Sequence, residues 1–558
     1  MLYTRPYMQQ RGWRFWAAAV LSAALLELPF PLAGPMPPWR SGFAWFGLAP
    51  LLWAVLSAVS WQAKWPVRRG FLLGYASGIL WYMGNCYWVR DTMMRYGGMP
   101  LMAPTLLLIG FSLVLGLYFG LFTVCVALVR RGTGSVRMAL AAAPVLWAAM
   151  ELAAARITSV PWDQLGYSQV DNGLVNQLAP WTGVYGISFV LVAVNALLAL
   201  GLLEGETRNR LRFGLPGVAL ALAGWAGILW PVPAEHPTAT AVLVQPNLDV
   251  GADNAWNGTA WDLHMAQFLK LAETNCVPDI EGIPQTGAPK GKTNCETETQ
   301  HPDLVVWPES PAPYAQADPR FVPSMGKIAQ TVHAPMVVGG VGMDYSESEQ
   351  QWHDYNSAMI FGADGAMVGR YDKIHLVPFG EYVPFRRFLF FARKLTGAVS
   401  SFDRGQERKV FRLNGHRYGV FICYEAVFAD EVRQFSRLGA QVLVNISDDG
   451  WYGDTSAPWQ HLNMARMRAV ENRRWLLRDT NNGVTAAIDP YGRVRQSIPR
   501  HETGALPASY GFRDDVTFYS EHGDLFAWLC AILGLAIVGR ALRASLQREL
   551  SKKSGPES

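Results

Sequence analysis

The sequence predicts a polytopic α-helical membrane domain joined to a layered α/β domain. Long apolar runs, separated by short arginine-containing loops, fill the chain up to about residue 231. The block that follows is more polar, and its apolar strand-like runs alternate with helical stretches. Half of the 558 residues are apolar and only 16% are charged, against about 25% in an average soluble protein. The net charge of +4 is too small to indicate a nucleic-acid partner.

Eight apolar runs are expected to cross a membrane. Each is close to the roughly 20 residues that a helix needs to span a bilayer core. Buried helices of a large soluble protein are the alternative, but seven such runs in succession, joined by short loops, disfavour it. The first run is not a cleaved signal peptide, because further spans follow it directly. The predicted spans are 13–34, 43–61, 70–89, 101–129, 138–155, 181–203, 214–231 and 524–541.

The distribution of lysine and arginine predicts the orientation of these spans. Seventeen of these residues occur in the N-terminal segment, in alternate loops and in the tail, whereas the opposite short loops hold only Arg40, Arg90, Arg95 and Arg156. Both termini are therefore predicted to be cytoplasmic. The chain divides into a seven-span domain (1–231), an extracytoplasmic α/β domain (232–520), and an eighth span with a cytoplasmic tail (521–558).

The extracytoplasmic block is expected to form a layered α/β domain, because continuous apolar strands are interleaved with helices. Two of its segments, 357–373 and 484–494, have turn residues at their centres and are expected to be hairpins. Helices are expected at 258–275, 319–333, 428–438 and 457–476. The other expected strands are 238–247, 303–310, 334–343, 418–425 and 440–449.

Several of these strands end in a residue that can carry chemistry. Glu309 follows one strand, Lys373 ends the first hairpin, and Cys423 ends the run YGVFIC. Singly, each has an ordinary explanation: a carboxylate at a helix start, a surface lysine, and a buried thiol. Together they supply a base, a cation and a nucleophile. A cysteine attacks as the thiolate, so it needs a base, and a lysine with backbone N–H groups can stabilise the resulting oxyanion.

Four motifs carry a resemblance to a known family. They are VVWPES (305–310), YDKIHLVPFGEYVPF (371–385), YGVFICYE (418–425) and DDGWYGDTSAPWQHLNMARMRAVENRRW (448–475). The sequence resembles the apolipoprotein N-acyltransferase family of the nitrilase, or carbon–nitrogen hydrolase, superfamily. The seven-plus-one arrangement of spans also matches, so the resemblance covers nearly the whole chain. It implies an αββα sandwich for the extracytoplasmic domain.

The resemblance also implies roles for individual residues. Cys423 is expected to be the nucleophile, Glu309 the general base, and Lys373 the stabiliser of the tetrahedral state. The backbone N–H of the residue after the nucleophile is the natural oxyanion donor. Supporting or substrate-contacting positions are expected at Glu381, Tyr424, Glu425 and Trp256.

The implied reaction moves an acyl chain from a phospholipid to the α-amino group of a lipoprotein's diacylglyceryl-cysteine, through a Cys423 thioester. The family acts without metal or ATP, in the inner membrane of bacteria. In agreement, the sequence lacks HExxH, CxxC and a phosphate-binding loop ending in GK[ST], and its histidines show no ligand spacing.

Two other functions are compatible with parts of this pattern. A membrane-tethered nitrilase-type amidase would use the same three residues with water as the acceptor, but it does not account for HLVPFGEYVPF and GWYGDTSAPWQH. A transporter or scaffold with a degenerate domain is disfavoured, because Glu309, Lys373 and Cys423 are intact and charges inside the spans are few.

Three further segments leave alternatives open. PFRRFLFFARKL (384–395) is either a lid that dips into the outer leaflet or an ordinary amphipathic surface helix. Cys276 and Cys295 flank an apparent insertion, 274–300, and are expected to form a disulfide in an oxidising compartment. The loop 156–180 is either part of a substrate entrance or a structural connector. Cys86, Cys125 and Cys530 are expected to be packing residues.

Overall fold

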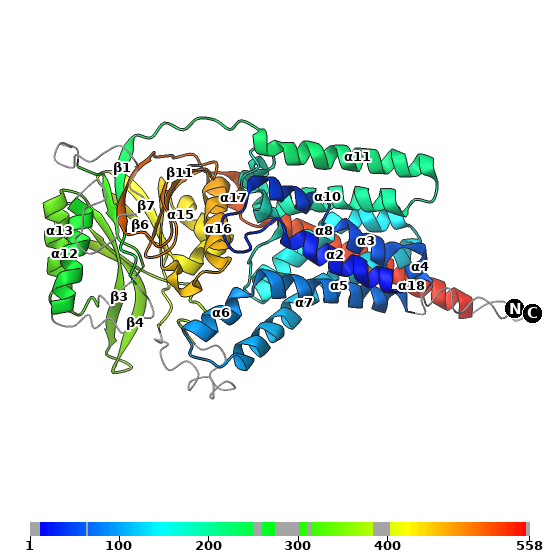
Figure 1. The fold of residues 1–558 in the computed structure, drawn as a ribbon, viewed down its shortest axis with the longest axis horizontal. Helices are drawn as coiled ribbons and strands as arrows, with labels where there is room; N and C mark the ends of the chain where they lie inside the picture. Colours follow the sequence, from blue (N-terminus) through cyan, green and yellow to red (C-terminus); the bar gives the residue numbers. More distant parts are fainter. Residues whose placement is uncertain are drawn as a thin grey trace, which may run out of the picture.

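The chain forms a bundle of helices and an α/β part that lie end to end (Figure 1). The computed structural model describes residues 12–62, 65–248, 259–273, 301–309, 315–382 and 402–553. In the helical part the elements are α2 (Trp13–Glu27), η1 (Pro38–Trp45), α3 (Ala49–Leu56), α4 (Ala58–Trp61), α5 (Pro66–Asn85), α6 (Trp88–Arg95), α7 (Met102–Thr133), α8 (Val136–Ile157), η2 (Leu165–Gln169), η3 (Val175–Leu178), α9 (Ala179–Thr182), α10 (Val184–Leu203), α11 (Thr207–Ala226), η4 (Gly227–Leu229), α17 (Phe518–His522) and α18 (Leu525–Lys553).

Five helices in the described part of the chain are long and apolar enough to cross a membrane: α7, α8, α10, α11 continued by η4, and α18. The first predicted span is shorter than expected, because α2 has only 15 residues. The second, 43–61, is not one helix. Ser57 has an extended ψ of 150°, separates α3 from α4, and caps α4 by accepting a hydrogen bond from the Ser60 N–H.

Glycines allow α5 and α7 to pack closely. A Cβ at Gly74 would lie 2.2 Å from Thr123 Oγ1, and one at Gly78 would lie 2.7 Å from the Cβ of Phe119. On the facing helix, a Cβ at Gly116 would lie 2.9 Å from Ile79. Such small-residue contacts are typical of helices packed inside membranes, where close van der Waals contact replaces the hydrophobic effect as the driving force.

The α/β part contains two six-stranded sheets. The first has the order β12-β1-β2-β3-β4-β5, and the second has the order β11-β10-β9-β8-β7-β6. The strands are β1 (Ala239–Gln245), β2 (Leu304–Val306), β3 (Met336–Ser346), β4 (Gln351–Phe361), β5 (Met367–Asp372), β6 (Val410–Leu413), β7 (His416–Ile422), β8 (Val442–Ser447), β9 (Trp475–Thr480), β10 (Thr485–Ile488), β11 (Val494–Ile498) and β12 (Gly504–Tyr510).

The two sheets face each other and helices cover their outer faces, which confirms the expected αββα layering (Figure 1). Leu243 and Val306 of the first sheet share a buried cluster with Val420 and Val444 of the second. Helices α12 (Thr259–Glu273) and α13 (Phe321–Val332) cover the first sheet. Helices α15 (Ala429–Arg437) and α16 (Ala457–Asn472) lie on the side of the second sheet that faces the helical bundle (Figure 1).

Both predicted hairpins are present, as antiparallel pairs β4–β5 and β10–β11. The helix predicted at 457–476 is wrong at its C-terminal end. Arg473 adopts a left-handed φ of 50° and ends α16, and β9 begins at Trp475. The predicted helix therefore extends four residues past the end of α16 and includes the first two residues of β9, a strand that was not predicted.

Helix α16 joins the two parts of the molecule. Its residues Ala457, Met464, Met467 and Val470 belong to the same buried cluster as side chains of α2, α5 and α10. The opposite face, with Leu462, packs in the buried cluster that contains the second-sheet residues Val420 and Val444. The α/β part is therefore built onto the bundle by a shared core, which fixes the second sheet at one end of the helices.

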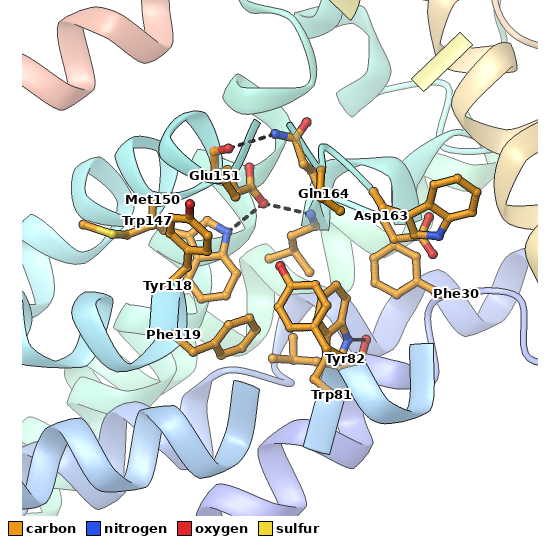
Figure 2. Close-up of a pocket in the computed structure, with 15 residues that line it drawn as sticks. Phe30, Trp81, Tyr82, Tyr118, Phe119, Trp147, Met150, Glu151, Asp163 and Gln164 are labelled. Carbon is orange, nitrogen blue, oxygen red and sulfur yellow. Dashed lines mark hydrogen bonds between the residues drawn. The ribbon is translucent and has the colours of Figure 1, made fainter. Parts of the chain in front are cut away.

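Nearly all residues from 161 to 172 in the loop 156–180 are buried, which favours a structural connector. Figure 2 shows that its start closes over a small cavity lined by aromatic side chains of α5, α7 and α8. One oxygen of Glu151 accepts hydrogen bonds from Trp147 Nε1 at 2.9 Å and from the backbone N–H of Leu165 at 2.8 Å. The same loop also contacts the α/β part, because Trp162 Nε1 donates to Gln460 of α16 at 2.9 Å.

The connector predicts a measurable role for Glu151. Glu151→Ala leaves two buried donors, Trp147 Nε1 and the Leu165 N–H, without their acceptor, at a cost of about 3 kcal/mol. The midpoint of thermal unfolding in detergent should fall by several degrees. Glu151→Gln retains an acceptor oxygen and should fall less. Equal midpoints for Glu151→Ala and the unchanged protein would contradict this assignment.

Candidate active site

Three segments from two sheets meet in one buried site. Glu309 lies three residues beyond β2, Lys373 directly follows β5, and Cys423 directly follows β7. Each is at most 6% exposed. Lys373 Nζ donates to Glu309 Oε1 at 3.0 Å, and Glu309 interacts with the Cys423 side chain. The structure therefore brings together the three residues that the sequence singled out.

Lys373 is held between two carboxylates. Its Nζ lies 3.0 Å from Glu309 Oε1 and 2.8 Å from Glu381 Oε1. Burial opposes its charge, but these two carboxylates raise the pKa of Lys373 well above its usual value. Asn356 Nδ2 donates to the same two oxygens, at 2.7 Å and 2.6 Å. Lys373 is therefore a fixed cation, and Asn356 of β4 fixes the carboxylates around it.

Glu309 is prepared to act as a base. Its Oε2 accepts a hydrogen bond from the backbone N–H of Asp448 at 2.9 Å. Burial alone would raise the pKa of Glu309, but the Lys373 charge and the hydrogen bond from Asn356 outweigh it and lower that pKa. The carboxylate is therefore ionised at neutral pH and has the form that accepts a proton.

Cys423 stands on a strained turn. It begins the short 3-10 helix η5 (Cys423–Val427) with a φ of 48°, a region that non-glycine residues rarely adopt. Burial and the negative charge of Glu309 raise the pKa of the Cys423 thiol, while Lys373 lowers it. The resting pair is thus a thiol beside a carboxylate.

The nucleophile turn offers a place for a developing oxyanion. Tyr424 lies in the first turn of η5, where backbone N–H groups have no partner within the helix. Its ring packs edge-on against Phe428, with ring centroids 5.2 Å apart. The Tyr424 N–H directly follows Cys423 in the chain, and the charge of Lys373 acts on the Cys423 thiol, so both are candidate groups for stabilising an oxyanion.

Glu425 ties the nucleophile turn to the segment that carries Lys373. This carboxylate is completely buried. Its Oε2 accepts from the Ile422 N–H at 2.8 Å. Its Oε1 accepts from the Ile374 N–H at 2.7 Å, the His375 N–H at 3.1 Å and Tyr371 Oη at 2.9 Å. Burial raises the pKa of Glu425 to about 6 despite these donors.

A second buried network supports the turn from behind, and sequence reasoning missed it. His461 of α16 donates its Nε2–H to the Cys423 carbonyl oxygen at 3.0 Å. The other ring nitrogen lies 2.9 Å from Asp449 Oδ1, and Arg478 donates to Asp449 Oδ2 at 2.7 Å. Burial opposes the negative charge, but Arg478 and His461 lower the pKa of Asp449. The histidine stands in the motif PWQH, but its spacing shows no link to Cys423.

The remaining predicted features lie outside the described residues. These are Trp256, the lid candidate 384–395, the insertion 274–300 and the pair Cys276 and Cys295. Cys86 and Cys530 are buried and Cys125 is partly buried, as expected of packing residues.

Two family models match separate parts of the chain and first define the class of its α/β part. The family model described as carbon-nitrogen hydrolase matches residues 296–509, and the one described as apolipoprotein N-acyltransferase N-terminal domain matches residues 22–197. Among solved structures, an amidase from Nesterenkonia sp. aligns over 54% of this chain and 99% of its own, with 18% identity and a TM-score of 0.35.

Curated relatives narrow the class to one family. An apolipoprotein N-acyltransferase of Geobacter metallireducens is 32% identical over 534 residues, covering 94% of both chains. One of Methylococcus capsulatus is 33% identical and covers 90% of this chain and 94% of its own. One of Pseudomonas putida is 31% identical over 87% of this chain and 88% of its own. The chain belongs to the apolipoprotein N-acyltransferase family.

The hydrogen bonds of Glu425 predict that the rate of Cys423 acylation depends on pH. Lowering the pH through about 6 protonates this carboxylate, which then cannot accept from all four of its donors, so acylation of Cys423 should slow below pH 6. Glu425→Gln should acylate about tenfold more slowly at pH 7 and show no change between pH 5 and 7.

The matched control is Glu407→Gln, which changes an exposed carboxylate that pairs with Lys409 and with no other cation of the described residues, and it should keep the pH dependence of the unchanged protein. The measurement is the initial rate of acyl-adduct formation by intact mass. If acylation by Glu425→Gln still slows below pH 6, the titrating group is not Glu425.

Proposed function

We propose that the protein transfers an acyl chain from a membrane phospholipid to the α-amino group of an apolipoprotein's N-terminal diacylglyceryl-cysteine. The observation that carries this proposal is the buried Glu309, Lys373 and Cys423 cluster in a carbon–nitrogen hydrolase domain whose α16 shares a core with apolar helices. Both substrates are anchored in lipid, so a site fixed at one end of a helical bundle suits them. The names of the relatives support the same reaction.

In the first step, Cys423 attacks the ester carbonyl of the phospholipid. Glu309 takes the thiol proton as the sulfur–carbon bond forms, which avoids a free thiolate in a buried site. Negative charge develops on the carbonyl oxygen, and Lys373 with the Tyr424 N–H stabilises it. The carbon–oxygen bond then breaks, Glu309 returns the proton to the leaving oxygen, and lysophospholipid departs from the thioester.

In the second step, the amine of the diacylglyceryl-cysteine attacks the thioester. Glu309 takes a proton from the amine nitrogen, the same oxyanion contacts stabilise the tetrahedral state, and the carbon–sulfur bond breaks. The proton passes from Glu309 to the Cys423 sulfur, which restores the thiol. No net proton or external energy source is consumed, because an ester is exchanged for a more stable amide.

We also propose that eight segments span the bacterial cytoplasmic membrane, with residues 1–231, 232–520 and 521–558 as the three regions and the α/β domain outside the cytoplasm. Two ion pairs support the prediction that the basic loops lie together on one side of the membrane. Arg131, in the last turn of α7, pairs with Glu549 near the end of α18, and Arg137, in the first turn of α8, pairs with Glu204 after α10. These basic loops therefore gather at the end of the bundle farthest from the sheets (Figure 1).

The first step predicts a covalent intermediate. Purified protein mixed with phosphatidylethanolamine alone should gain the mass of one acyl chain, removable by hydroxylamine, because a thioester on Cys423 waits for the amine. Cys423→Ala should show no adduct, whereas Cys125→Ala, a change within α7, should form it normally.

A diacylglyceryl peptide with a free amine should then discharge the adduct and become acylated. Discharge by water at the same rate as by the peptide would indicate a hydrolase of the amidase type instead. Absence of any adduct in the unchanged protein would refute the thioester mechanism.

A further inference from the structure

A second, positively charged cleft lies beside the catalytic site. It has a volume of about 310 Å³ and opens between α6 and two loops of the α/β part. One loop contains η6 (Asp449–Tyr452) with the residues after it, and the other joins β11 to β12. Its lining residues are Arg95, Tyr96, Asn247, Gly450, Gly453, Asp454, Asn482, Arg500 and His501.

The lining of the cleft has more basic than acidic side chains. Arg95 is exposed, and within the described part of the chain its guanidinium has no ion pair or hydrogen bond. Arg500 is 8% exposed and donates to the Gly453 carbonyl oxygen at 2.9 Å. Asp454 is the one carboxylate of the lining; it lies 3.7 Å from Arg500 and 2.7 Å from His501. The lining thus contains two guanidinium groups and one carboxylate, and that carboxylate pairs with Arg500 and His501.

The two arginines meet at Gly453: Arg500 donates to the Gly453 carbonyl oxygen at 2.9 Å, and a Cβ added to Gly453 would lie 2.8 Å from Arg95 Nη1. Burial lowers the pKa of Arg500, and the charge of Arg95 lowers it further, whereas Asp449 and Asp454 oppose this effect. Like charges held together at a partly buried site are disfavoured unless an anion lies between them. The empty volume between Arg95 and Arg500 is therefore favourable for an anionic group that can accept hydrogen bonds from both.

The position of the cleft relates it to the acyl donor. Its wall, η6, immediately follows Asp448, whose N–H donates to Glu309, and contains Asp449, which contacts His461. Helix α6 links the ends of α5 and α7 that face the sheets (Figure 1). At the rim, Trp451 is 48% exposed and packs on Tyr96, with ring centroids 5.3 Å apart. Exposed tryptophan and tyrosine at helix ends are typical of the headgroup level of a membrane.

We propose that this cleft binds the phosphate group of the phospholipid that donates the acyl chain. Arg95 and Arg500 would donate to its non-bridging oxygens, since a guanidinium matches phosphate geometry and stays charged in a partly dry site. The assignment rests on the proposed function, because it names the subsite for the donor of that reaction. An acidic peptide of the acceptor is the less favoured occupant, since the cleft is lined by the end of α6, at the level of the helix ends.

Arg95 is the residue to change, because it is exposed and its loss leaves no buried partner unpaired. In vesicles, Arg95→Gln should raise the apparent KM for phosphatidylglycerol or phosphatidylethanolamine about tenfold, with kcat for Cys423 acylation nearly unchanged. Arg95→Lys should recover part of the loss. Arg90→Gln is the matched control, because Arg90 lies on the same helix but pairs with Asp91.

A comparison of two acyl donors separates loss of phosphate binding from a general loss of activity in Arg95→Gln. Acylation of Cys423 by a soluble p-nitrophenyl ester, which carries no phosphate, should be the same in Arg95→Gln as in the unchanged protein. Equal losses with both donors, or no change with the phospholipid, would overturn the proposal. A defect confined to discharge by the diacylglyceryl peptide would assign the cleft to the acceptor and overturn it too.

Inorganic phosphate distinguishes a lipid headgroup from a free anion. We expect weak competition with the phospholipid in the unchanged protein and none in Arg95→Gln. Competition by inorganic phosphate combined with an unchanged phospholipid KM in Arg95→Gln would show that the cleft takes free phosphate and not the lipid. If the unchanged protein forms no acyl adduct with phospholipid but does so with the p-nitrophenyl ester, the proposed function fails for a separate reason.

Discussion

The buried charge of Lys373 is the constraint on which the site depends. An isolated ammonium in this position would be too costly to keep charged, so two carboxylates must approach it from different parts of the chain. Each carboxylate needs donors in turn, and Asn356 and the Asp448 N–H provide them. The cluster is therefore an obligate set: removing one member leaves an uncompensated charge on another. The same interactions that stabilise this set also hold Glu309 in its basic form.

The position of the Cys423 sulfur depends in turn on the contacts that hold its backbone turn in place. The turn at Cys423 is strained, and it persists because it is held from two sides. Glu425 binds it to the segment after Lys373, and His461 binds its carbonyl oxygen to α16. Helix α16 also shares a core with the bundle, so the sulfur is positioned relative to the apolar helices as well as to the sheets. A site that must meet substrates anchored in lipid gains from this continuity.

Local patterns in the sequence were sufficient for much of the fold. The two hairpins, the helices at α12, α13 and α15, and five of the expected spans follow from apolar periodicity and turn residues. The exceptions have identifiable causes. Strand β9 was not predicted and the expected helix extends into its first two residues, because the left-handed conformation of Arg473 that ends α16 leaves no mark in the apolar pattern. Strand β12, GALPASY, was missed because glycine and proline are poor strand formers, yet it pairs with β1 at the edge of a sheet.

The sequence by itself determined the two-part architecture and the identity of the candidate chemical groups, Glu309, Lys373 and Cys423. These depend on residue type and on neighbours within a few positions. Only the tertiary structure decided which groups surround them. The Asp448 N–H reaches Glu309 across 139 positions of the chain, and His461 contacts Cys423 from a different helix. The cleft of Arg95 and Arg500 likewise joins α6 to a loop of the α/β part. Periodicity reports which face of an element is buried, whereas compensation of a buried charge depends on distances between segments that no local pattern records.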